Sequence, residues 1–275
     1  MRLSNPLFAL FAVVAIAAPV SAARAAGDLL VAPTRVILDG SRGTEVVLNN
    51  IDTEPATYRI SLELKRMTPE GGLETVDETN ATPAERAALD MIRFSPRRIT
   101  LPPNQPQVVR LGVRVPEGLA AGEYRAHMLF RAVPDAVAAT TAAKPADGNV
   151  AVSLKPIYGI TIPVIVRVGA LAADATIGKA WVEKDTESNT SFNFDLARTG
   201  NRSVYGDIDV FEPGTSAPLL SVRGIAVYAE LAGRRVTLDV PPELAEKLKG
   251  PVTIRYTEDR EVGGGTIDQA DRVVN

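Results

Sequence analysis

The strongest constraint on the fold of this chain is a series of short runs in which apolar and polar residues alternate. The run 57–64 (TYRISLEL) is the clearest example. A period of two places one face of the run toward a core and the other toward solvent, as in a half-buried β-strand. Such runs recur at intervals of roughly 8–15 residues and are bounded by Asp, Asn, Gly and Pro. The sequence therefore predicts an all-β protein made of antiparallel β-sandwiches.

Few segments depart from this pattern. The other candidate strands are 29–38, 45–48, 91–94, 98–101, 108–115, 124–133 and 150–168, followed by 180–182, 192–196, 204–211, 236–240 and 252–256. Thr82 and Glu85 have the spacing of a capping box around Pro83, which predicts a short helix from there to Leu89. The segment 241–248 is a second short helix candidate.

Composition divides the chain into three parts. Segment 1–26 carries Arg2, an uncharged apolar run and small residues up to Ala22 and Ala25, as in a secretory signal peptide cleaved after one of these alanines. The apolar run is shorter than the ~20 residues of a membrane span. Segment 134–149 is small and low in complexity, which predicts a long loop. We expect an N-terminal Ig-like domain over 27–168, a C-terminal Ig-like β-sandwich over 169–275, a periplasmic location and no membrane insertion.

Composition also excludes several classes of function. The chain has no cysteine and one histidine, His127, which excludes thiol chemistry, iron–sulfur clusters and polyhistidine metal sites. A formal net charge of −3 and an aromatic content of 5% give no support to nucleic-acid binding. No nucleophile elbow or acid–base pair stands out. We therefore expect neither an enzyme nor a cofactor.

The run 154–167 (LKPIYGITIPVIVR) is the most informative segment. Its period-two face carries Leu154, Tyr158, Ile160, Ile162 and Val164. Two prolines remove ladder donors, which fits an edge strand. A long apolar edge strand invites pairing with another chain. Two interpretations stay open on the residues alone: a continuous core strand, or a strand offered to a partner.

Arg35 lies within the first apolar run, between Val31 and Val36. It is either an arginine on the solvent face of a strand or an anchor for a carboxylate, which the planar guanidinium fork suits.

The order of these features resembles the periplasmic pilus-assembly chaperones of the chaperone–usher pathway, a family of two Ig-like domains. The resemblance rests on 33–37 (PTRVI), 94–110 (FSPRRITLPPNQPQVVR), 122–134 (GEYRAHMLFRAVP) and 150–167. The resemblance in sequence covers about 29–168. Beyond residue 168 only the predicted strand arrangement resembles the family. It implies a non-enzymatic chaperone that complements a pilin-like subunit with a strand and delivers it to an outer-membrane usher. Arg35 would lie in the cleft, and the apolar face of 154–164 would fill the subunit's groove.

This chain also departs from the family pattern. Pro163 stands where the family commonly has a cleft lysine, so Arg35 would act alone or with Lys155. The resemblance implies a buried acid–arginine network holding the two domains at a fixed angle, with Glu123, Arg167 and Asp259 as its members here. Arg167 follows an apolar strand, and Glu123 opens the strand expected beside it.

Two rival functions stay open. One is a secreted structural β-sandwich, such as an adhesin or pilus-associated subunit; the other is a periplasmic enzyme or sugar-binding sandwich. The client, the usher and whether the free protein caps its own edge by forming a dimer are not specified by the sequence.

Overall fold

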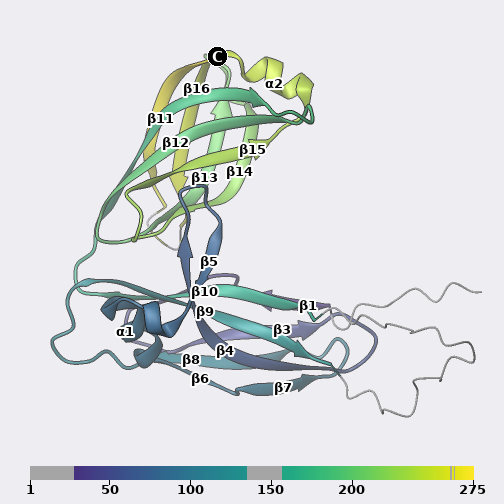
Figure 1. Ribbon diagram of the computed structural model, residues 1–275, viewed down its shortest axis with the longest axis vertical. Helices are drawn as coiled ribbons and strands as arrows, with labels where there is room; N and C mark the ends of the chain where they lie inside the picture. The colour runs from purple at the N-terminus through teal and green to yellow at the C-terminus, as the bar shows by residue number, and fades with distance from the viewer. Residues whose placement is uncertain (1–27, 135–156, 261, 263) are drawn as a thin grey trace, which may run out of the picture.

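The computed structural model describes residues 28–134, 157–260, 262 and 264–275. The proposed signal peptide, the predicted loop, and Leu154 and Lys155 lie outside these residues. The chain forms two β-sandwiches that meet at an angle (Figure 1).

The first contains β1 (Leu29–Ala32), β2 (Val36–Leu38), β3 (Thr44–Asn50), β4 (Ala56–Met67), β5 (Leu73–Val76), β6 (Ile92–Ser95), β7 (Arg98–Leu101), β8 (Gln107–Val113), β9 (Gly122–Val133) and β10 (Gly159–Val168). The second contains β11 (Ala173–Lys184), β12 (Thr190–Gly200), β13 (Val204–Phe211), β14 (Pro218–Val227), β15 (Gly233–Asp239), β16 (Gly250–Glu258) and β17 (Thr266–Val274).

Each sandwich consists of two sheets with its own apolar core. Domain 1, the first sandwich, packs the sheet β1-β3-β8-β6 against β2-β10-β9-β4-β5, in which β7 also pairs with β4. Domain 2, the second sandwich, packs β11-β12-β15 against β14-β13-β16-β17. Strand pairs are antiparallel except that β10 and β2 run parallel. The all-β class and the tandem antiparallel sandwiches expected from the sequence are confirmed, with this one parallel pair as the exception.

Both predicted helices are present. α1 (Pro83–Met91) begins at Thr82, whose side chain accepts a hydrogen bond from the Glu85 N–H while the Glu85 carboxylate accepts one from the Thr82 N–H. Glu85 also forms a two-bond ion pair with Arg66 of β4, and this guanidinium lowers the pKa of Glu85 to about 2. The ion pair fixes the start of α1 on domain 1. α2 (Pro242–Leu248) packs on domain 2.

The first predicted strand, 29–38, is split between two sheets. β1 pairs with β3, whereas β2 pairs with β10 of the opposite sheet. Pro33 lies between them and has no N–H to continue the first ladder. Arg35 falls in the break, not inside a strand as the sequence predicted.

β10 is covered unevenly along its length. It pairs with β9 from Gly159 to Val168, but with β2 only at Val164–Val166. Ile162 and Val164 are 2% and 0% exposed and belong to the core of domain 1, so at these two residues the core-strand interpretation applies and the face is not open to a partner in the free protein. Tyr158 is 52% exposed, and Ile160 is partly buried against the core.

Burial predicts different effects of truncation along this face. Ile162→Ala is expected to lower the free energy of unfolding by about 3 kcal/mol, because it removes buried methyl groups and leaves a cavity. Tyr158→Ala is the matched control and is expected to change it by less than about 1 kcal/mol, since its ring is half in solvent. Urea unfolding of both variants measures the difference. Equal losses would mean that β10 is not anchored through Ile162.

Candidate functional site: the domain joint and the open edge of β10

The two domains meet over a small apolar cluster. Met67 and Ile165 of domain 1 pack with Ala226 and Tyr228 of domain 2. Ile165 lies on the outer face of β10, the face that points away from the core of domain 1. Domain 2 covers this outer face only near the C-terminal end of β10. Because the cluster is small, polar contacts around it have a large part in setting the angle between the domains.

Arg125 of β9 makes the most extensive of these contacts. Its guanidinium donates two hydrogen bonds to Glu230 of domain 2, at 2.6 and 3.1 Å, and lies 3.5 Å from the centroid of the Tyr228 ring. It also donates to the Lys65 carbonyl oxygen at 2.9 Å. The Arg125 side chain is 8% exposed. A partly desolvated bidentate pair stacked on an aromatic ring is stronger than a surface ion pair.

The hairpin of β4 and β5 forms a second connection. It projects from domain 1 to the base of domain 2 (Figure 1). The Met67 N–H donates to Glu230 at 2.9 Å, and the Pro69 carbonyl oxygen accepts a hydrogen bond from the Arg235 N–H at 2.8 Å. Gly71, at a φ of 88°, leaves no room for a Cβ beside the Arg234 guanidinium.

Arg35 lies within the joint. It is 7% exposed, donates to the Ser203 hydroxyl at 3.2 Å and stacks 4.3 Å from the centroid of the Tyr205 ring. Its Nε is buried and has no hydrogen-bond partner within the described part of the chain. The guanidinium is therefore held mainly by domain 2, and its Nε is a buried donor that no described group uses.

The structure brings Glu123 and Arg167 together. They are opposite each other on β9 and β10, and Arg167 Nε donates to Glu123 Oε2 at 3.3 Å. The Glu123 side chain is 1% exposed. Within the described residues, Glu123 Oε1 and Arg167 Nη2 are buried without a hydrogen-bond partner, so this pair is not the two-bond fork seen at Arg125.

Both members of this pair belong to domain 1, and their link to domain 2 is electrostatic. Burial lowers the pKa of Arg167, and the nearby cations Arg202 and Arg35 lower it further while Glu123 opposes them. The Glu123 charge in turn raises the pKa of Arg198 in domain 2, against a larger lowering by burial.

The other acidic contact in this region is made by Glu258. Its carboxylate binds Arg202 at 2.5 Å, with both side chains largely buried. Asp259, the third acid expected from the sequence, donates its N–H to the Tyr205 carbonyl oxygen at 3.0 Å and so supports the ring beneath Arg35. Its part in an interdomain acid–arginine network stays a prediction.

Arg198 organises the loops of domain 2 that face the joint. It is 8% exposed and donates to carbonyl oxygens of two separate segments. The acceptors are Thr199 and Gly200 at the end of β12 and Arg202 of the loop that follows, and Ala229 and Leu231 of the loop between β14 and β15. These loops carry Arg202 and Glu230, so Arg198 acts as a positioning residue for the joint.

His127 is buried at the edge of this network. It is 1% exposed, lies edge-on to Tyr228 at 6.3 Å between ring centroids, and neither ring nitrogen has a hydrogen-bond partner within the described residues. Burial, together with the charges of Arg125, Lys65 and Arg35, lowers the pKa of His127 to about 3. The ring is therefore neutral at neutral pH.

The other end of β10 has an unpaired edge. The Ala132 N–H donates to the Tyr158 carbonyl oxygen at 3.0 Å. Because main-chain groups alternate along an antiparallel ladder, those of Gly159 and Thr161 point away from β9. Within the described residues no strand pairs with β10 on that side before Val164.

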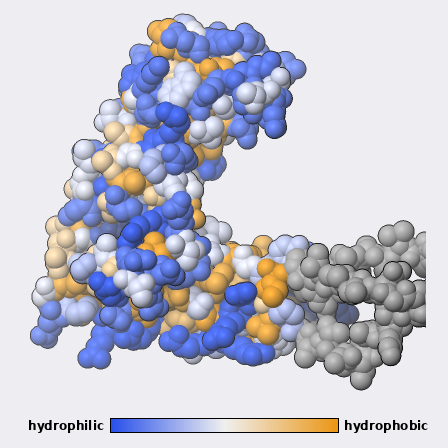
Figure 2. Space-filling model, in the orientation of Figure 1, coloured by the Kyte–Doolittle hydropathy of each residue, from blue (hydrophilic) through white to orange (hydrophobic). Residues whose placement is uncertain are grey.

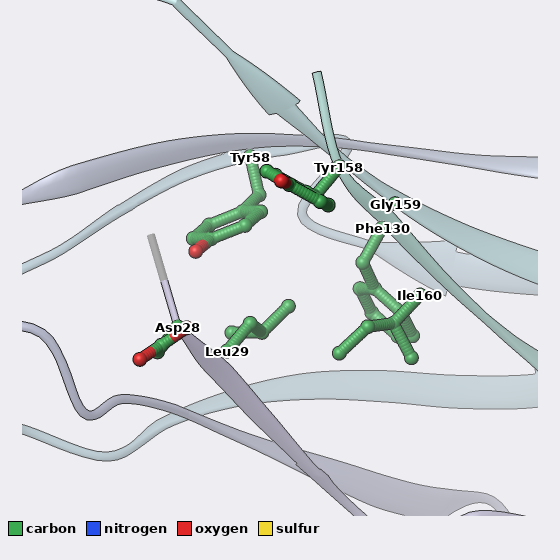
Figure 3. A pocket seen from close by; sticks show the side chains of 7 residues that line it. All are labelled: Asp28, Leu29, Tyr58, Phe130, Tyr158, Gly159 and Ile160. Carbon is green, nitrogen blue, oxygen red and sulfur yellow. The ribbon is translucent and has the colours of Figure 1, made fainter. Parts of the chain in front are cut away.

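A pocket of about 250 Å³ opens beside this edge. Tyr58, Phe130, Tyr158 and Ile160 line it with Leu29 and Asp28 at the start of β1 (Figure 3). The two tyrosine rings lie near one another at one side, and Leu29 lies opposite them. In the space-filling view, orange apolar surface occurs near the end of domain 1 where the grey trace joins (Figure 2). The pocket lies between the start of β1 and the start of β10, outside the part of β10 that β2 covers.

The structure thus divides the predicted site residues into two groups. Arg35, Glu123 and Arg167 lie at the joint, whereas Tyr158 and Ile160 lie at the pocket. Sequence reasoning missed Arg125, Arg198 and Glu230. Arg125 had a signal in its position on the strand next to Glu123, but its acceptors belong to loops with no recognisable pattern.

Two further features were searched for in the described residues. No helix among them is long and apolar enough to cross a membrane. No cluster of acidic, histidine or cysteine side chains among them has the makings of a metal site.

No family model and no curated protein sequence matches this chain. Solved structures with similar folds include three that are, or contain, chaperones. The YadV chaperone has 15% identity over 89% of this chain and 99% of its own, with a TM-score of 0.46. The CsuC–CsuE chaperone–tip adhesion subunit complex of Acinetobacter baumannii has 12% identity over 90% and 99%, with a TM-score of 0.45. The Salmonella enterica SafA pilin–SafB chaperone complex has 15% identity over 90% and 96%, with a TM-score of 0.44.

The contacts of Arg125 predict that its removal loosens the joint. Arg125→Ala is expected to lower the free energy of unfolding by about 3 kcal/mol, because Glu230 loses its cation and Tyr228 its stacking partner. Arg223→Ala is the control: it breaks an exposed ion pair with Asp207 and should cost less than about 1 kcal/mol. Urea unfolding gives the energies, and small-angle X-ray scattering reports the domain angle. An unchanged scattering curve for Arg125→Ala would contradict this role.

The lowered pKa of His127 predicts sensitivity to acid. With an unfolded-state pKa near 6.5, the unfolded chain binds a proton that the folded chain excludes until the pH approaches 3. Stability from this residue is therefore present above about pH 6.5 and falls as the pH is lowered, by about 3 kcal/mol at pH 4. His127→Leu should retain stability at pH 7 and lose less between pH 7 and 4. Identical pH profiles in urea unfolding would show that the folded state accepts the proton.

Proposed function

We propose that this protein is a non-enzymatic periplasmic chaperone that binds a pilin-like subunit by strand complementation and delivers it to an outer-membrane usher. The observation that carries the proposal is the open edge of β10 at Gly159 and Thr161 beside an apolar pocket. The ordered sequence motifs of domain 1, which resemble those of the pilus-assembly chaperones, support the same conclusion.

Strand addition uses both features of this edge. Main-chain groups of Gly159 and Thr161 are available for a ladder with a client strand, which gives affinity with little dependence on sequence. Tyr158 and Ile160 present apolar surface next to that ladder, and Leu154 would extend it. Burying two or three such side chains would contribute several kcal/mol before the ordering of both chains is subtracted.

Ile162 and Val164 have a different part in this proposal. Their burial in the core holds the end of β10 in place, while Val164–Val166 pair with β2. The strand is thus firmly attached at one end and open at the other. A client would complement the part before Ile162, and exposure of Ile162 and Val164 to the client would require domain 1 to open.

Arg35 keeps its proposed role as the anchor for a client carboxylate, with a condition set by its surroundings. The guanidinium is bound to Ser203 and covered by Tyr205, so a carboxylate would have to displace the weaker hydroxyl acceptor. The free Nε is the donor that such a carboxylate would satisfy. Glu123, Arg167 and Asp259 would act indirectly, by keeping domain 2 in place over Arg35.

The test removes one main-chain donor from the open edge. Thr161→Pro deletes an N–H that points away from β9, so domain 1 should fold while a client ladder loses a bond and meets the proline ring. Thr161→Ala is the matched control, because it loses the same side-chain bond to Glu63 but keeps the N–H. Tagged wild type and both variants would be recovered from the periplasm of the source bacterium, and bound proteins identified by mass spectrometry.

Wild type and Thr161→Ala are expected to bring down a pilin-like subunit, and Thr161→Pro to lose at least about nine-tenths of it, a tenfold weakening. Equal recovery with Thr161→Pro would show that the β10 edge is not the binding site. Recovery of the usher with the wild-type complex would test delivery separately.

A further inference from the structure

Three arginines form a row across the outer face of the large sheet of domain 1. Arg59 of β4 is directly opposite Arg98 of β7 on one side and Arg131 of β9 on the other. All three are exposed. Neighbouring strands lie about 4.8 Å apart, so three like charges are gathered within roughly 10 Å.

No anionic group of the described chain neutralises this row. None of the three side chains makes an ion pair, side-chain hydrogen bond or ring contact within the described residues, whereas Arg66 and Arg125 of the same sheet are each paired with a glutamate. Like charges directly opposite each other destabilise a sheet. The row is also local, because the chain as a whole has a formal net charge of −3.

The row ends at the open edge of β10. Arg131 is opposite Gly159, the first residue of β10, and Gly159 carries no side chain of its own. A strand added to β10 would place a residue next to Gly159 in the same cross-strand row. Its outward side chain would lie about two strand spacings from Arg131, within reach of a long guanidinium side chain.

Polar hydroxyl groups flank the row on both sides. On the side of the strand ends, Thr57 and Thr100 are opposite each other and share a hydrogen bond of 2.8 Å, with Val133 on the other side of Thr57. On the side of the joint, Ser61 and Thr161 lie on either side of the half-buried Leu129. Guanidinium groups beside hydroxyl groups suit a carboxylate, and the like charges of the row make this face unfavourable for a cationic side chain.

We propose that the row Arg98–Arg59–Arg131 selects an acidic client strand and fixes its register, with a Glu or Asp placed beside Gly159 on the outer face. This inference rests on the proposed strand addition at β10. Main-chain bonds alone would allow the client strand to slip by two residues, and a charge pair at one position favours a single register. The row thereby adds selectivity to a ladder that by itself is indifferent to sequence.

The probes are two fluorescein-labelled nonapeptides, one alternating Val and Glu and one alternating Val and Gln. In a strand added to β10, the valines face the pocket side and the polar residues face the arginine row. We expect the acidic peptide to bind about tenfold more tightly at low salt by fluorescence anisotropy, and this advantage to shrink at high salt.

The triple variant Arg59→Gln/Arg98→Gln/Arg131→Gln should lose this advantage while keeping its affinity for the Gln peptide. Its urea midpoint should not fall, because repulsion is relieved. The matched control Arg42→Gln/Arg93→Gln/Arg114→Gln removes the same charge from exposed positions elsewhere on domain 1 and should keep the advantage.

The other outcomes each overturn a defined part. If wild type binds both peptides equally and Thr161→Pro binds neither, the selectivity assigned to the arginine row is wrong, whereas strand addition at β10 is supported. An acidic-peptide advantage that persists in Thr161→Pro overturns the register role. Absence of binding by the acidic peptide overturns the inference in full. Tighter binding of a heparin fragment than of the acidic peptide, lost in the triple variant, would assign the row to sulfated polyanions.

Discussion

The break in the first strand at Pro33 is the constraint on which the remaining features depend. A proline cannot donate to the ladder with β3, so the chain leaves the first sheet and resumes in the other as β2. β2 has only three residues and covers only the end of β10. The beginning of β10 is consequently left with an unpaired edge, and the pocket opens between the start of β1 and the start of β10. The same break places Arg35 outside both ladders, where its side chain reaches domain 2.

The joint between the domains is held by guanidinium groups whose acceptors are mostly not carboxylates. Arg198 binds five carbonyl oxygens, Arg35 binds a hydroxyl and an aromatic face, and Arg125 combines a carboxylate with a ring. A guanidinium carries donors in a fixed planar fork, so each of these residues fixes the direction of several groups at once. This arrangement suits a joint whose apolar cluster is small. The directions of the guanidinium hydrogen bonds, more than the buried apolar area, then determine the angle between the two domains.

Much of the fold could be predicted from the sequence, because strand alternation and turn residues are local signals. The run 57–64 became the inward and outward faces of β4, and Thr82 with Glu85 formed the predicted cap. The site was predictable only in part. Glu123 and Arg167 could be placed opposite each other, since consecutive strands joined by a loop usually pair. The partner of Arg125 in domain 2, Glu230, is a loop residue brought near by the packing of the two domains, and the acceptors of Arg198 are main-chain carbonyl groups, so no side-chain pattern specifies either set. The exposure of β10 was misjudged because period two shows which residues share a face, but not how far the covering strand extends.

Several groups of domain 1 have no compensating partner within the described residues. Within the part of the chain that the structure describes, the main-chain groups of Gly159 and Thr161 on the outer edge have no strand partner, and Arg35 Nε is buried without a hydrogen-bond partner. The arginine row also places like charges side by side. Each is tolerable because a continuous core, anchored by Ile162 and Val164 in this strand, holds the fold independently of the edge. A bound strand with an acidic outer face would satisfy the main-chain groups and the arginines together. In the proposed function, the free energy that these groups do not gain in the free protein would become available for binding the client strand.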